Sequence, residues 1–375
     1  MIGETFFAER RQELDPAVIA SAPNAPAVFV VWAAEGAPYL ARTALLKRRL
    51  TRLLRERDQP SRLLNLKSVA RNIHYWLSGS RLESSILFYS LARTHFPDHY
   101  LKIAKLRMPS YIKLTLSNSF PRLQVTTRVG GGRGLYFGPF RSRAAAEKFE
   151  GESLDLFQIR RCQENLAPRP DHPGCIYGEM GTCLRPCQQV VNQSEYASEV
   201  ARMEKFLVTG GSSLLDSISA ARDRWSEELQ FEEAARQHKR HERVEQVLAL
   251  RDELVNDAGS LHGVAITPST NPGAVTLWYM MQGLWTDPVE FSLTPVDGAM
   301  VSLDQRLRDD IANLVTPRGS LTDRQEHIAI LSGWFYSSWC DGEWLAFPDA
   351  KRIPYRKLVN AVARVAKTTS ALSKT

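Results

Sequence analysis

Apolar residues recur along this chain with two periods, one typical of strands and one typical of helices. A run of β-branched and aromatic residues at 26–34 predicts a buried strand. The pair Glu35-Gly36 predicts a turn into a short return strand at 39–41. Further strands are predicted over residues 111–116, 123–127, 263–266 and 274–281, with a flexible hairpin tip at 130–134 and a Gln282-Gly283 turn into another short strand.

Helical spacing of apolar positions predicts helices over much of the remaining chain. In residues 42–57 one apolar face is formed by Leu46, Leu50, Leu53 and Leu54, and Thr43 is expected to cap the start of this helix. Arg42, Arg49 and Arg52 would lie toward one side of it. Other helices are predicted over residues 82–94, 141–159, 194–209, 303–314 and 323–336, with a helical hairpin over 212–255 and a basic amphipathic tail over 351–367.

These elements predict an α+β protein, because strands and helices occur in groups along the chain. We expect a small basic α/β domain, a mixed sheet that leads into a cysteine-rich segment, a helical hairpin, and a small α+β C-terminal region. The predicted boundaries divide the chain into an N-terminal extension and four further parts, at residues 1–21, 22–106, 107–192, 193–258 and 259–375.

Positive charge is concentrated in one part of the chain. The net charge is +7 and the isoelectric point about 9.2. Between Tyr39 and Lys113 there are 16 Lys and Arg but only 4 Asp and Glu. A polyanion such as DNA is therefore an expected partner of this part. The alternative from charge alone is a solvated basic face that contacts no phosphate.

No secretory or membrane-spanning segment is predicted. The first residues are polar, and the most apolar stretch, residues 25–34, is too short to span a bilayer. We therefore expect a cytoplasmic protein without a membrane partner.

Four of the five cysteines fall within 26 residues, with the spacing C-x12-C-x7-C-x3-C. Few apolar side chains surround them, so this segment needs a cross-link to fold. In a reducing compartment clustered cysteines are more often metal ligands than disulfides. Structural zinc sites favour close pairs at both ends, but only Cys183 and Cys187 form one here. The metal ligands are predicted to be Cys162, Cys175, Cys183 and Cys187, whereas Cys340 is expected to be an ordinary buried thiol.

The order of elements in the basic part resembles the GIY-YIG nuclease domain, and specifically that of the UvrC family of bacterial nucleotide excision repair. The family pattern GVY…YVGKAKNLRRRL is similar to Ala27-Val28-Phe29 followed by YLARTALLKRRL from Tyr39. The family's helix with a glutamate near its start resembles LESSILF from Leu82. Glu83 alone would otherwise be interpreted as a helix-start charge favoured by the dipole.

The resemblance implies a role for each matching residue. Tyr39 would orient or deprotonate the attacking water, and Glu83 would hold one Mg²⁺ or Mn²⁺. Arg49 would offset charge on the scissile phosphate, and Arg42 would occupy the position of a family lysine. The residues expected to contact DNA phosphates are Lys47, Arg48 and Arg52.

Several positions depart from the family pattern. Phe29 replaces the first motif's tyrosine, so one hydroxyl is missing. Ala27 and Ala41 replace glycines, and Tyr100 replaces an asparagine. Two functions are therefore expected as alternatives: an active nuclease, or a catalytically weakened protein that still binds DNA.

The middle of the chain resembles UvrC proteins in the phrases YIKLT from Tyr111, FPRLQVTTRV from Phe120 and YFGPF from Tyr136. The four-cysteine spacing that follows is similar to the family's iron–sulfur site, which implies a [4Fe–4S] cluster, with zinc as the alternative. Residues 229–235, LQFEEAA, resemble the UVR motif that meets the helicase subunit UvrB, with Phe231 and Ala235 as anchors. The basic residues 238–241 depart from that motif.

The resemblance therefore implies a short UvrC-like protein without the RNase H-like half. The expected function is a metal-dependent single-strand cut on the 3′ side of damaged DNA, made with a UvrB-type helicase subunit. The rivals are the non-catalytic DNA- and partner-binding protein and a redox sensor that carries the cluster.

Overall fold

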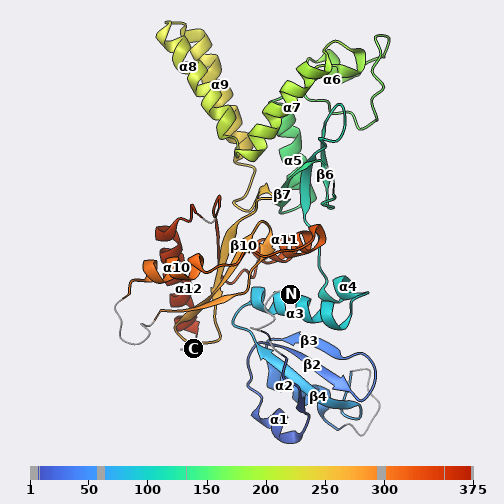
Figure 1. Ribbon diagram of the computed structural model, residues 1–375, viewed down its shortest axis with the longest axis vertical. Helices are drawn as coiled ribbons and strands as arrows, with labels where there is room; N and C mark the ends of the chain where they lie inside the picture. Colours follow the sequence, from blue (N-terminus) through green and yellow to red (C-terminus); the bar gives the residue numbers. More distant parts are fainter. Residues whose placement is uncertain are drawn as a thin grey trace. The chain divides into compact units, whose positions relative to one another are not determined.

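The computed structural model describes residues 7, 9–56, 64–131, 133–293, 301–349 and 351–372, with side chains described as far as Thr368. These residues divide into two compact units. The first comprises Met1–Arg107, His262–Arg318 and Gly333–Thr375, and the second comprises Met108–Leu261 and Gly319–Ser332. Helices and strands are both well represented, which confirms the α+β class (Figure 1). The finer division into five parts stays a prediction.

The first sheet of unit 1 is antiparallel, with the order β1-β4-β2-β3. The buried strand predicted at 26–34 is β2, and its side chains alternate between two cores. Phe29 and Val31 pack with α2, whereas Val28 and Val30 pack with α3, so one helix covers each face. The elements of this sheet and its helices are β1 (Gln12–Glu13), α1 (Pro16–Ser21), β2 (Ala27–Ala33), β3 (Tyr39–Thr43), α2 (Leu46–Leu54), β4 (Ala70–Leu77), α3 (Arg81–His95) and α4 (Tyr100–Ala104).

The helix predicted over residues 42–57 is shorter than expected. Arg42 and Thr43 belong to β3, where they pair with Val28 and Ala27, and α2 begins only at Leu46. The prediction that Thr43 caps the helix is wrong, because its Oγ1 accepts from the Leu45 N–H within a turn. Arg42 therefore does not share a helix face with Arg49. Residue 57 lies outside the described residues.

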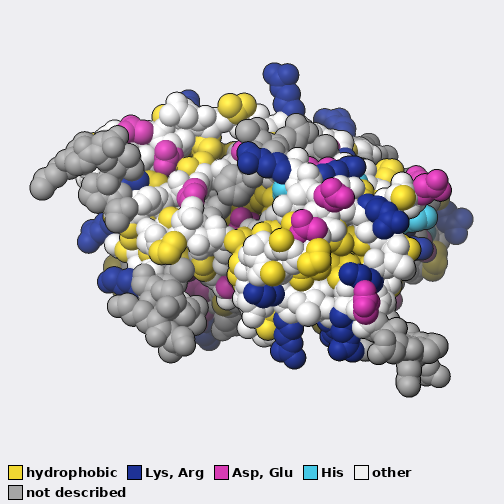
Figure 2. Space-filling view, turned by 90° about the horizontal axis from the view of Figure 1, so that it is seen from below, with side chains coloured by type: hydrophobic (Ala, Val, Ile, Leu, Met, Phe, Trp, Pro, Cys, Tyr) yellow, Lys and Arg dark blue, Asp and Glu magenta, His cyan; other side chains and the backbone are white. Residues whose placement is uncertain are grey.

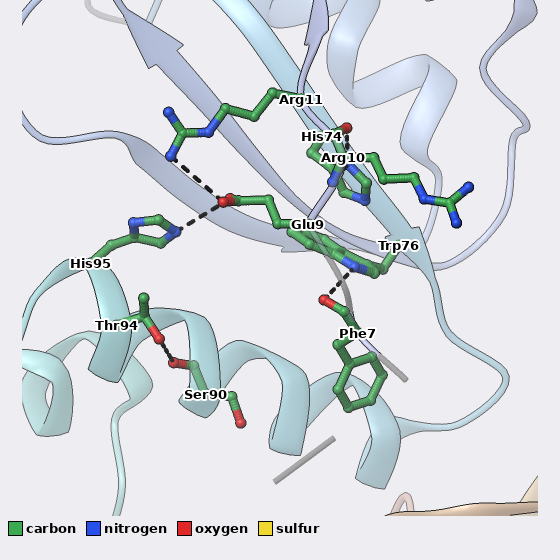
Figure 3. Close-up of polar contacts among 9 residues, drawn as sticks. All are labelled: Phe7, Glu9, Arg10, Arg11, His74, Trp76, Ser90, Thr94 and His95. Atoms are coloured by element: carbon green, nitrogen blue, oxygen red, sulfur yellow. Dashed lines mark hydrogen bonds and ion pairs between the residues drawn. The ribbon is translucent and has the colours of Figure 1, made fainter. Parts of the chain in front are cut away.

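The N-terminal segment runs along β4 and α3 (Figure 3). Trp76 Nε1 donates to the Phe7 carbonyl at 3.2 Å, and the Arg10 N–H donates to His74 Nδ1 at 2.7 Å. Glu9 lies 3.5 Å from His95 Nε2, which is on α3. This segment therefore closes the edge of the sheet rather than extending from it.

The second sheet of unit 1 has the order β11-β10-β9-β13, with β12 also paired to β10. Its strand β10 is buried along its whole length. The predicted strands and the turn after β10 are confirmed. The elements are β9 (Gly263–Pro268), β10 (Ala274–Met281), β11 (Leu284–Trp285), β12 (Val289–Ser292), α10 (Leu303–Ala312), α11 (Leu321–Phe335), β13 (Glu343–Ala346) and α12 (Tyr355–Leu372), of which the first twelve residues of α11 belong to unit 2.

Unit 2 contains a sheet with the order β6-β5-β7-β8 and a group of helices that share one apolar core with it. The loop at 130–134 joins β6 to β7, but β5 lies between these strands, so the predicted hairpin tip is wrong. The elements are β5 (Ser110–Leu114), β6 (Leu123–Thr126), β7 (Leu135–Phe140), α5 (Arg143–Leu154), α6 (Ile176–Glu179), η1 (Pro186–Gln188), α7 (Gln193–Val208), α8 (Ser212–Glu227), α9 (Phe231–Leu248) and β8 (Asn256–Asp257).

No helix in the described part of the chain is both long enough and apolar enough to cross a bilayer.

Candidate functional site

Two of the predicted catalytic residues contact each other directly. Tyr39 begins β3 and Arg49 lies in the first turns of α2, and Arg49 Nη2 donates to the Tyr39 hydroxyl at 2.9 Å. Both side chains are half-buried on the α2 face of the sheet. Arg49 Nε is buried and has no hydrogen-bond partner among the described residues. A buried donor of this kind is normally satisfied by an acceptor, so a bound ligand oxygen would suit it.

Phe29 takes the place of the missing tyrosine in this arrangement. It is fully buried, and its ring centroid lies 6.0 Å from that of Tyr39. Ala41 pairs with it across the strands. Tyr100 begins α4, where its ring packs edge-on against Tyr89. The positions that depart from the family pattern are therefore filled by packed side chains.

Glu83 lies in the first turn of α3, which Ser80 caps through its hydroxyl. The Gly79 N–H donates to Glu83 Oε2 at 2.8 Å, and the residue is only 4% exposed. Burial raises the pKa of Glu83 to about 7, and the charges of Glu290 and Asp341 add to this rise. The turn that carries Gly79 also packs closely on the 268–270 backbone, since a Cβ on Gly79 would lie 2.4 Å from the Ser269 carbonyl carbon.

The geometry around Glu83 fits a divalent cation only in part. A carboxylate is a suitable ligand for Mg²⁺ or Mn²⁺, and a cation would relieve the repulsion among the three carboxylates. Mg²⁺ bound through one carboxylate keeps several waters, however, and a buried carboxyl leaves no room for them. Among the described residues, no three His, Cys, Asp or Glu side chains are arranged to hold a metal ion. The carboxyl group of Glu83 is therefore not accessible to a hydrated metal ion in this conformation.

Arg42 lies on the opposite face of the sheet from the Tyr39–Arg49 pair. Its Nη1 donates to Ser85 Oγ on α3 at 3.1 Å, and its guanidinium carbon lies 5.2 Å from the Phe88 ring centroid. Partial burial lowers the pKa of Arg42, and the charge of Arg81 lowers it further. The structure thus gathers the four predicted residues into two groups, and no hydrogen bond among the described residues links one group to the other.

The residues predicted to contact DNA lie on α2 and are exposed. Lys47 Nζ donates to the Ala20 carbonyl at 2.8 Å, which fixes its direction. Arg48 and Arg52 are also exposed. Figure 2 shows Lys and Arg side chains at many separate points of one face, with Asp and Glu between them. Positive charge on that face is therefore dispersed rather than gathered into one patch.

The four clustered cysteines come from the segment between α5 and α7, and all four are free thiols. Cys183 and Cys187 are buried, whereas Cys162 and Cys175 are half-buried. Burial raises the pKa of Cys162 and of Cys183, and the charges of Cys175 and Cys187 raise both further. The four thiols therefore lie in one neighbourhood, but no three of them are arranged to hold a metal ion in the part of the chain that the structure describes.

Arg160 supplies an independent reason for negative charge at this place. It is 1% exposed, and Nη2 donates to the Glu164 carbonyl at 2.6 Å. Its Nε and Nη1 have no partner among the described residues, and no ion pair reaches it there. A buried guanidinium is stabilised by an anion beside it, and the charge of Arg160 in turn lowers the pKa of Cys162 against the larger effect of burial. The sequence analysis did not single out Arg160, although its place two residues before Cys162 was a signal.

The residues predicted to bind a partner lie at the exposed end of the α8–α9 hairpin. Phe231 begins α9 and is 65% exposed, and Leu229 in the connecting turn is 72% exposed. Ala235 is also exposed. Leu229 has a φ of 59°, which an L side chain adopts rarely. Leu229 and Phe231 thus present two apolar side chains to solvent where α8 meets α9.

Cys340 corrects a prediction. It is exposed rather than buried, and its Sγ lies 3.7 Å from the Gly342 carbonyl oxygen.

Comparison with known proteins finds similarity to one family. Residues 110–206 match the family described as the UvrC/Cho excinuclease middle domain, a range that contains all four clustered cysteines. UvrABC system protein C of Lachnospira eligens is 24% identical over 282 residues, 74% of this chain and 46% of that protein. The protein of that name from Moorella thermoacetica is 30% identical over 220 residues, 58% of this chain and 35% of that protein. No solved structure matches.

Residues 110–206 are therefore similar to the middle domain of excinucleases. The relatives extend the match beyond that domain, which confirms the predicted resemblance to UvrC proteins. The chain spans less than half the length of these relatives.

The raised pKa of Glu83 predicts a stability that depends on pH. The folded state holds the proton more tightly than the unfolded state, whose pKa is near 4.5, so stability is lost as the pH rises from 4.5 to 7. Glu83→Gln keeps the bond to Gly79 and removes the ionisation. We expect the variant to be more stable than the parent by about 3 kcal/mol at about pH 8, and equally stable at about pH 4. Thermal unfolding at both pH values measures this, and an equal difference at both would contradict it.

If the four cysteines bind a metal ion, the buried charge of Arg160 is expected to stabilise the thiolates that hold it. Arg160→Met should lose bound metal to a chelator several-fold faster than the parent, and its metal-free form should be at least as stable as the metal-free parent. Arg161→Met is the matched control, because Arg161 already pairs with Asp155 at 2.7 Å. Metal content and unfolding temperature give both readouts. Unchanged metal loss in Arg160→Met would show that the thiolates do not compensate this charge.

Proposed function

We propose that this chain acts in nucleotide excision repair as a UvrC-type endonuclease that cuts one strand of damaged DNA, on the 3′ side, together with a UvrB-type helicase subunit. The observation that carries the proposal is the hydrogen bond from Arg49 to Tyr39, with a buried Arg49 donor left unsatisfied. A phenol held by a guanidinium beside an open donor suits the attack of water on a phosphate. The similarity to UvrC proteins supports the same chemistry.

In this proposal each residue has a limited task. Arg49 fixes the Tyr39 hydroxyl, which orients the attacking water, and Arg49 Nε takes a phosphate oxygen. Arg42 would hold an adjacent phosphate near α3. A divalent cation on Glu83 would add positive charge beside the phosphate held by Arg42, on the α3 side of the sheet, once that carboxyl is uncovered.

The second candidate function is DNA and partner binding without catalysis. Two observations favour it: Phe29 fills the place of a catalytic hydroxyl, and Glu83 is closed to solvent. The same experiment separates the two functions.

The test is nicking of a duplex with one lesion, in the presence of Mg²⁺ and a UvrB-type subunit. Tyr39→Phe and Glu83→Gln should each reduce the rate by about a hundredfold or more. Tyr75→Phe is the matched control, because Tyr75 packs against the same core as Tyr39. If the parent and all variants nick the duplex at the same background rate, the catalytic function is wrong. DNA and partner binding is then the candidate function that is left.

We also propose that the four cysteines hold a [4Fe–4S] cluster, with zinc as the alternative. The spacing, the gathering of the four thiols in one segment and the uncompensated charge of Arg160 support a four-thiolate centre. The cluster would link the sheet of unit 2 to α7. Iron and sulfide in the purified protein would support the cluster, and zinc alone would replace it.

The end of the α8–α9 hairpin is proposed to bind the UvrB-type subunit. Phe231→Ala should weaken that binding by about tenfold or more, because an exposed aromatic that becomes buried is a common anchor. Val208→Ala is the control, since Val208 is 58% exposed on α7 of the same unit. Titration calorimetry with the purified subunit measures both. Equal affinities for Phe231→Ala and the parent would remove the hairpin end from the interface.

A further inference from the structure

A cavity of about 460 Å³ lies within unit 1, at the ends of β2 and β3 and the start of α3. Its volume is in the range of sites that take small ligands. The residues that give it chemical character are Arg42, Arg81, Ser84, Ser85, Trp339 and Asp341. Trp339 and Asp341 come from the loop between α11 and β13, which was not among the predicted functional segments.

Two guanidinium groups face this cavity beside several hydroxyls. Arg42 is oriented by its bond to Ser85, and Arg81 is the first residue of α3. Asp341 is the only carboxylate among the described lining residues. Both of its oxygens accept hydrogen bonds, so its charge is partly satisfied. The cavity therefore suits an anion such as a phosphate.

Trp339 provides an aromatic wall. Trp339 is 40% exposed, and the Arg81 guanidinium carbon lies 5.1 Å from the centroid of its ring. An exposed indole next to guanidinium groups is a combination that binds nucleic acid by stacking and charge.

The loop that carries Trp339 is held in place. Asp341 Oδ2 accepts from the Arg81 N–H at 2.6 Å, and Oδ1 accepts from Trp334 Nε1 at 2.8 Å. Gly342 lies against β9, where a Cβ would come 2.2 Å from the Ile266 carbonyl oxygen. Asp341 thus links Trp334, in the last turn of α11, to the start of α3. The aromatic wall is therefore preorganised before a ligand arrives.

We propose that Trp339 stacks on a nucleobase of the DNA substrate, while Arg42 and Arg81 bind the adjacent phosphate. This inference rests on the proposed function for the identity of the substrate. Stacking recognises any base, so the contact adds affinity without sequence preference. A strand that leaves the duplex near the cut would supply the unstacked base.

Fluorescence anisotropy with a short labelled single-stranded oligonucleotide tests the proposal on the full chain. Trp339→Ala should bind about tenfold more weakly, and Trp339→Phe should stay close to the parent because a phenyl ring still stacks. Arg81→Gln should reduce the salt dependence by about one phosphate contact. Unchanged unfolding temperatures show that the variants are folded.

Equal affinity of Trp339→Ala and the parent overturns the inference. Faster nicking by Trp339→Ala without weaker binding also overturns it, because the loop would then be a cover over Glu83. The two proposals fail separately. If the parent does not nick DNA but Trp339→Ala binds more weakly than the parent, the endonuclease proposal is contradicted and the DNA contact is supported. If the parent nicks DNA and Trp339→Ala binds as tightly as the parent, only the DNA contact is contradicted.

Discussion

The burial of the first turn of α3 is the constraint on which the candidate site depends. Ser80 caps this turn, Gly79 packs on the backbone of the C-terminal sheet, and Asp341 accepts from Arg81. The helix start is therefore fixed by parts of the chain that follow it by more than half its length. The same contacts bury Glu83 and create the cavity beside it. The contacts that fix these side chains in place are therefore also the ones that shield the Glu83 carboxyl from solvent.

Much of the fold could be predicted from the sequence, because β2, β9 and β10 are continuous apolar runs and α7 has clear helical spacing. The prediction missed β4, the strand between β1 and β2. The apolar pattern of β4 is interrupted by Arg71, Asn72 and His74. The N-terminal segment covers part of this strand, with the Arg10 N–H donating to His74. The start of α2 was also wrong, because pairing with β2 holds Arg42 and Thr43 in a strand against their helical spacing.

The candidate site was predictable only where a motif marked it. The contact between Tyr39 and Arg49 agrees with roles that the motif assigned, although their catalytic use stays a prediction. Trp339, Asp341 and Arg160 were not found, because their importance comes from tertiary contacts that no local pattern records. The burial of Glu83 could not be predicted from the sequence either. A glutamate at a helix start has the same local sequence whether or not a second sheet covers it.

The uncompensated charge of Arg160 also bears on how the protein is made. A guanidinium buried without an anion destabilises a chain by on the order of several kcal/mol. If the thiolates of a metal centre are its counter-charge, the core around α5 and α7 closes only after the metal has arrived. A newly synthesised chain would then remain open in this region until it bound that metal.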